Sequence, residues 1–86
     1  MLVKWYAVLM FDGPVKPAYL EFIARVDEAF ERASSLELGY RYGQVYFNTL
    51  CKVLPEAADK LLETNNNPFY SEEVSDITHE LVELLF

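Results

Sequence analysis

The amino-acid sequence predicts an all-α fold, a compact bundle of about four helices. Apolar residues recur at helical spacing along most of the chain after residue 16, so that one face of each expected helix can be buried. Pro17, Pro55 and Pro68 divide this pattern, because proline suits the first turn of a helix but disrupts its interior. Hydrophobic residues make up 52% of the chain and aromatic residues 15%, which is enough for one core.

The first two expected helices have clear ends. One begins at Pro17 and ends at Ser34-Ser35, and the next covers about residues 40–54. It stops there because Pro55 lacks a backbone N–H donor and restricts the residue before it. The apolar face of the first helix consists of Tyr19, Ile23, Val26, Phe30 and Ala33.

The other two helices lie on either side of a break at residues 65–68, where three asparagines precede a proline. Pro55 starts the earlier one, which continues to about Glu63. The last helix is expected from about Glu72 to the end of the sequence, with Ser71 as its N-cap. The residues at core spacing on this helix are Val74, Ile77, Leu81, Leu84 and Leu85.

The sequence predicts a single helical domain. Residues 1–12 form an apolar N-terminal extension of it, and residues 17–86 form its helical core. Residues 2–11 are apolar apart from Lys4, and so short a run fits either a buried strand or a helix. We favour a helix because no second strand follows; a strand would need a partner from another chain and would predict a homodimer. The run is about half the ~20 residues that span a bilayer, and no cleavage site follows it, so we expect neither a membrane anchor nor a signal peptide.

Charge and cysteine content narrow the range of partners. The formal net charge is −7, which repels nucleic-acid phosphates and anionic membranes and attracts a basic protein surface. Such a charge also keeps a small domain soluble. Cys51 is the only cysteine, so neither an intramolecular disulfide nor a cysteine-based zinc site can form. We therefore expect a protein of a reducing cytoplasm, which the resemblance described below assigns to a bacterial host.

The segment around Gly43 has a composition that core packing alone does not require. Gly43 falls within the apolar arc of its helix, where glycine costs ~1 kcal/mol relative to alanine, which indicates close contact with another backbone or an aromatic ring. The opposite side carries Arg41, Gln44 and Asn48. In one interpretation these three bind the loop at residues 67–70 and a carboxylate of the last helix; in the other they form a recognition face for another macromolecule.

These residues resemble a known sequence pattern. Small uncharacterised proteins of bacteriophages and bacteria share Arg-x-Gly-Gln-x-x-Phe-Asn-x-Leu, a helix started by proline, and Thr-x-x-Asp-Pro-Phe-Tyr. Asn67 replaces the usual aspartate of that group, which weakens any role for a carboxylate there. The resemblance covers about residues 17–86 and implies a compact helical fold and a phage or prophage origin, but no activity. The matching residues are Arg41, Gly43, Gln44, Phe47, Asn48, Leu50, Pro55, Ala58, Thr64, Pro68, Phe69 and Tyr70.

Signatures of catalysis and of cofactor binding are missing from the sequence. His79 is the only histidine and lacks a second metal ligand at a suitable spacing. Pairing of Cys51 with His79 as nucleophile and base would still need an orienting group and an oxyanion site. The three glycines are scattered and form no phosphate-binding loop. We therefore expect a non-enzymatic protein without catalytic residues, cofactor or metal.

The sequence favours a small acidic module that binds another protein. In this hypothesis it is a phage-encoded inhibitor or modulator of a host protein, which it binds at a basic surface that otherwise holds nucleic acid. The alternative is a structural protein that self-assembles into a dimer through its apolar N-terminal segment. The carboxylates expected to bind the partner, all on the last helix, are Glu72, Glu73, Asp76, Glu80 and Glu83.

Overall fold

The computed structural model describes residues 16–86, and in this part of the chain it consists of four α-helices joined by loops. The helices are α2 (Pro17–Ser35), α3 (Tyr42–Val53), α4 (Pro55–Leu62) and α5 (Asp76–Glu83). The all-α prediction is therefore confirmed. The question of helix or strand at residues 2–11 lies outside the described residues.

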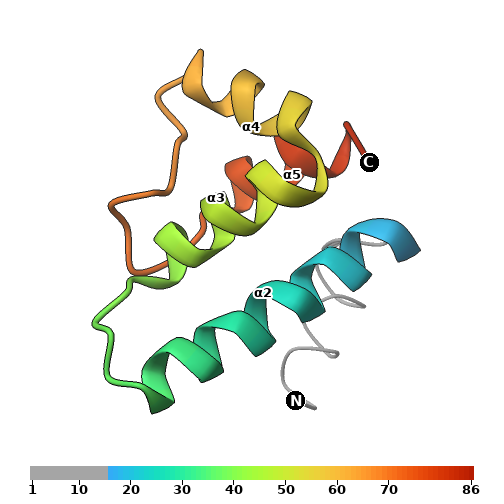
Figure 1. Cartoon of the computed structure of the whole chain (residues 1–86). Coiled ribbons are helices and arrows are strands. Elements are labelled where there is room, and N and C mark those ends of the chain that lie inside the picture. Colours follow the sequence, from blue (N-terminus) through green and yellow to red (C-terminus); the bar gives the residue numbers. More distant parts are fainter. Residues whose placement is uncertain (1–15) are drawn as a thin grey trace.

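Helix α3 lies at the centre of the bundle. It contacts α2 on one side and α4 on the other, and Figure 1 shows α2 and α3 running in nearly opposite directions. It buries more of its circumference than a surface helix does, because Val45 is buried as well as Tyr46 and Phe47. The core that these three helices enclose contains Tyr19, Phe22, Ile23, Val26, Val45, Tyr46, Phe47, Leu50, Ala57, Ala58 and Leu61.

The first three helices end where the sequence predicts an end, within two residues. Helix α2 closes with Leu36, whose N–H donates to Arg32 O, and Pro55 stands at the first position of α4. Leu54 between α3 and α4 has left the helical region, with φ −147° and ψ 77°, because a following proline disfavours helical backbone at this position. The two helices can therefore turn sharply against each other.

Gly43 is where the loop between α4 and α5 contacts α3. The N–H of Gly43 donates to the carbonyl of Ser71 at 3.0 Å, and the N–H of Ser71 donates to the carbonyl of Pro68 at 2.8 Å. A Cβ atom on Gly43 would lie 1.9 Å from Pro68 O and 2.6 Å from Ser71 O. The predicted close contact with another backbone is therefore present. The loop carbonyl also accepts one of the N–H groups that the first turn of α3 leaves without an intrahelical partner.

Helix α5 differs from the prediction in both its start and its orientation. It begins at Asp76, and its N-cap is Ser75, whose Oγ accepts from Thr78 N, so the expected start at Glu72 with Ser71 as N-cap is wrong. The helix buries Thr78 and Val82. The residues at core spacing, in contrast, are partly or largely exposed: Ile77 59%, Leu81 37%, Leu84 72% and Leu85 45%.

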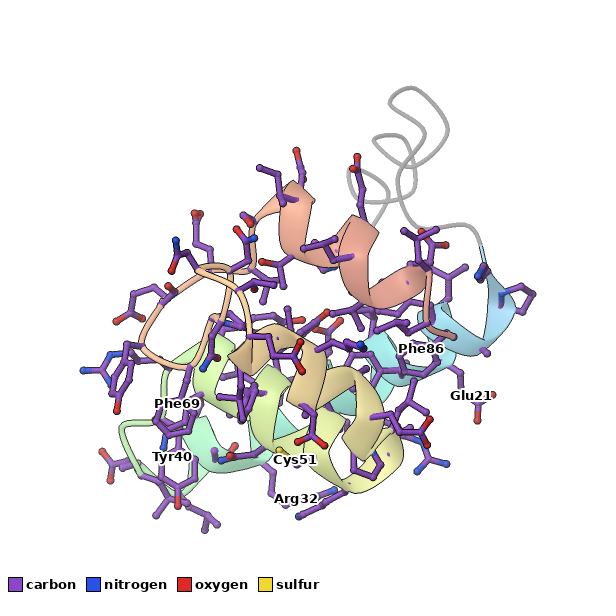
Figure 2. The ribbon with its side chains drawn as sticks, turned by 90° about the horizontal axis from the view of Figure 1, so that it is seen from above. Glu21, Arg32, Tyr40, Cys51, Phe69 and Phe86 are labelled. Atoms are coloured by element: carbon purple, nitrogen blue, oxygen red, sulfur yellow. The ribbon has the colours of Figure 1, made fainter. Side chains whose placement is uncertain are left out.

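Polar contacts explain this orientation of α5. The Thr78 hydroxyl donates to the carbonyl of Asn66 at 2.9 Å and lies 3.1 Å from Ser75 Oγ. His79 Nδ1 lies 2.7 Å from the Tyr19 hydroxyl. Figure 2 shows the Phe86 ring between α5 and α2, where it packs against the rings of Tyr19 and Phe22. These contacts turn the face with Thr78 and His79 inward and leave the aliphatic face outside.

Replacing Gly43 with alanine tests the contact with the loop. Alanine raises helix propensity by about 1 kcal/mol, but its Cβ would meet backbone oxygens that cannot move aside. We expect Gly43→Ala to lower the free energy of unfolding by about 3 kcal/mol, and Gly43→Val to cost at least as much. Urea denaturation of the purified variants measures this.

Gly39 provides the matched control. Its φ is +71° and nothing lies within 4 Å of a Cβ added there. Gly39→Ala should therefore lose only about 1–2 kcal/mol, the cost of a left-handed backbone. Equal losses for the two alanine variants would show that the loop does not constrain α3 through Gly43.

Candidate functional site

The carboxylates that the sequence assigns to one acidic helix occupy two elements in the structure. Glu72 and Glu73 lie in the bends before α5, and Asp76 and Glu80 lie on α5 itself; all four are exposed. Together they are called the acidic row here. The segment of residues 71–76 lines a shallow depression of about 560 Å³. Placement of Glu72 and Glu73 on the last helix is thus wrong, although both remain next to it.

The acidic row has no cation from the described part of the chain to neutralise it. The ion pairs among residues 16–86 both lie on α2, Arg25 with Glu21 and Arg32 with Glu28. Arg41 is exposed and forms no ion pair with α5, contrary to one of the two interpretations of the sequence. Four negative charges between residues 72 and 80 therefore face water.

Glu83 differs from the other carboxylates. It is half-buried, and its Oε2 accepts a hydrogen bond from the backbone N–H of Lys16 at 2.8 Å. This bond holds the start of α2 beside the last turn of α5, so Glu83 has a structural role. The partner-binding role expected for it from the sequence is better assigned to the acidic row alone.

An apolar stripe lies beside the acidic row on α5. It consists of Ile77 and Leu81 on α5 and of Leu84 and Leu85 in the turn directly after it. At about 100° per residue, the four side chains fall on one side of the helix. Figure 2 shows side chains of α5 directed away from α3 and α4. Between α4 and α5 the stripe continues into a groove of about 340 Å³, lined by Ala57, Lys60, Leu61, Leu81, Leu84, Leu85 and their neighbours.

A chain of hydrogen bonds runs through the core. The hydroxyls of Tyr19 and Tyr46 lie 2.6 Å apart, and Tyr19 in turn contacts His79. Protons can be arranged along this chain in either direction, according to the tautomer of His79. Sequence reasoning missed the chain; the signal is tyrosine rather than phenylalanine at buried positions, because a buried hydroxyl needs a partner.

Burial raises the pKa of three tyrosines well above the ordinary value near 10. For Tyr19 the neighbouring Tyr46 adds to the effect of burial, and for Tyr42 the carboxylate of Asp27, which accepts its hydrogen bond at 2.5 Å, does so. For Tyr46 burial outweighs the lowering effect of the hydrogen bond with Tyr19. All three phenols therefore stay protonated while the chain is folded.

The amide side chains of α3 do not bind the loop at residues 67–70. Asn48 is exposed, Gln44 is half-buried, and neither side chain forms a hydrogen bond with the loop in the described residues. The loop is held instead by Gly43 and by the rings of Phe47 and Phe69, 6.0 Å apart.

Pairing of Cys51 with His79 is not supported by their positions. Cys51 is exposed, whereas the His79 ring contacts Tyr19 and Tyr46 inside the bundle. Within residues 16–86, no group of three or more histidine, cysteine or acidic side chains is arranged to hold a metal ion. No helix in that range is long and apolar enough to cross a membrane.

The protonated tyrosines predict a steep loss of stability in alkali. Their folded-state pKa values lie above the unfolded value near 10, so their contribution is complete below pH 10 and is lost as the pH rises further. For each of the three tyrosines, the free energy of unfolding should fall by about 1.4 kcal/mol for every pH unit above pH 10. Urea denaturation between pH 8 and about pH 11 measures the slope, and Tyr46→Phe should reduce it by one tyrosine's share. An identical slope in Tyr46→Phe would contradict the assignment.

Comparisons of the chain with protein-family models, with curated proteins and with solved structures find no match, so its function is inferred from its own residues.

Proposed function

We propose that this protein is a small acidic, non-enzymatic module that binds a basic surface of another protein. The observation that carries the proposal is the acidic row, Glu72, Glu73, Asp76 and Glu80, which is exposed and has no ion-pair partner among the described residues. Such a row attracts a positively charged surface over several ångströms of water and orients it before contact.

The chemistry of the row fits a protein better than a nucleic acid. The net charge of −7 repels phosphates, and the four exposed carboxylates of the acidic row contribute to this charge. A basic groove that normally holds nucleic acid offers cations at a matching density. In the bacteriophage setting that the sequence pattern implies, the module inhibits or modulates a host protein in the cytoplasm by occupying such a groove.

A second candidate function is self-assembly. The exposed apolar stripe on α5 favours it, since large aliphatic side chains gathered on one face often mark an interface. Light scattering after size-exclusion chromatography separates the two candidates. A monomer at micromolar concentration favours the acidic module, and a stable homodimer favours assembly.

Charge reversal tests the acidic row. We expect Glu72→Lys, Glu73→Lys and Glu80→Lys, made together, to abolish capture of bacterial proteins from a lysate at low salt. Asp76 is left unchanged because a carboxylate in the first turn stabilises α5 by up to about 1 kcal/mol. Capture by the wild-type protein should also weaken as salt is raised, because the Debye length shortens to ~3 Å at 1 M. Mass spectrometry identifies what each variant captures.

The matched control reverses three exposed carboxylates elsewhere, Glu31, Asp59 and Glu63. Three reversals change the charge by six, so both triple variants have a formal net charge of −7 + 6 = −1. We expect the control to keep capturing the proteins that the wild type captures. Equal loss in both variants would mean that total charge matters and the row does not.

A further inference from the structure

The apolar stripe on α5 and the turn after it is exposed among the described residues. Leu84 is 72% exposed and Ile77 59%, although both follow the spacing of a buried face. The groove beside them is lined mostly by aliphatic side chains, among them Ala57 and Leu61 of α4. Stripe and groove together form a continuous apolar surface on one side of the bundle.

The described part of the chain begins beside the last turn of α5, because the N–H of Lys16 donates to Glu83 Oε2. Glu83 lies on the side of the helix away from Leu81 and Leu85, and the near edge of the stripe, Leu84, is about 100° further round the helix. Fifteen further residues precede Lys16, and residues 2–11 of these are apolar except for Lys4. Residues 2–11 are thus an apolar segment attached close to an apolar surface that the described residues leave exposed.

The length of the linker and the charge of the apolar segment also fit docking on the stripe. Residues 12–15 can span up to ~14 Å when extended, which is enough to carry the apolar segment from Glu83 to the near edge of the stripe at Leu84. Its single charged side chain, Lys4, is positive, whereas Asp76 and Glu80 border the stripe with negative charge. The segment adds no carboxylate that the acidic row would repel.

We propose that residues 2–11 dock on the α5 stripe and the adjoining groove of their own chain. A short linker keeps the segment at an effective concentration in the millimolar range, far above the micromolar concentration of a second copy in solution. Docking within one chain therefore prevails over exchange between two chains. The same docking removes from solvent the surface that would otherwise favour self-assembly, and it does not depend on the acidic row or its partner.

The only tryptophan of the chain, Trp5, lies in the segment and reports its environment directly. In the full-length protein at micromolar concentration we expect its fluorescence to be blue-shifted from that of the urea-denatured chain and shielded from acrylamide. The double variant Ile77→Gln and Leu84→Gln should move the emission towards the denatured value and raise the quenching rate. Both side chains are largely exposed, so circular dichroism should show unchanged helix content.

A double variant in the connection between α2 and α3 is the matched control. Leu36 and Leu38 are 64% and 50% exposed, and Leu36→Gln with Leu38→Gln removes the same kind of surface away from α5. We expect the emission of Trp5 to stay as in the wild type.

Three outcomes would overturn the proposal. In the first, Trp5 of the wild-type protein is quenched as readily as in the denatured chain. In the second, both double variants, or neither, change the emission. In the third, shielding of Trp5 depends on protein concentration and accompanies a dimer in light scattering, which assigns the stripe to a second copy.

Discussion

The contact between Gly43 and the loop before α5 is the constraint on which the rest of the structure depends. Because Gly43 has no side chain, the carbonyls of Pro68 and Ser71 can approach the first turn of α3 from the side. That contact fixes the course of a loop with no helix of its own. Residues 71–76 follow directly, so the same contact sets where the acidic row begins and where α5 starts.

The orientation of α5 then follows from polar groups. A buried hydroxyl or imidazole must keep a partner, because an unsatisfied one costs about 1–3 kcal/mol, as much as leaving one leucine exposed. The orientation of α5 gives Thr78 and His79 such partners inside the bundle, the carbonyl of Asn66 and the hydroxyl of Tyr19. The aliphatic residues of α5 therefore lie on the outer face, where they form an apolar stripe that the described bundle does not cover.

Most of the fold could be predicted from the sequence because its signals are local. Pro17 and Pro55 mark helix starts, and a glycine within an apolar arc indicates the close backbone contact at Gly43. The orientation of α5 could not be predicted this way. Its deciding hydrogen bonds join residues 12 and 60 positions apart, Thr78 with Asn66 and His79 with Tyr19, whereas periodicity reads only neighbours on one helix. The partner-binding role of the acidic residues stays a prediction, but their arrangement differs from the expected one, since the helix starts at Asp76 instead of Glu72 and Glu83 binds the backbone of Lys16.

Helix α5 and the residues on either side of it thus present two unlike surfaces to solvent, and each suits a different kind of partner. The acidic row keeps its charges hydrated and can act at a distance, so it suits a separate basic protein that must first be attracted and oriented. The stripe gains free energy only by direct contact, and contact is entropically cheapest for a segment already attached nearby. In the arrangement proposed above, residues 2–11 cover the stripe, so no second copy of the chain is needed to bury it. The acidic row then remains the surface that another protein meets.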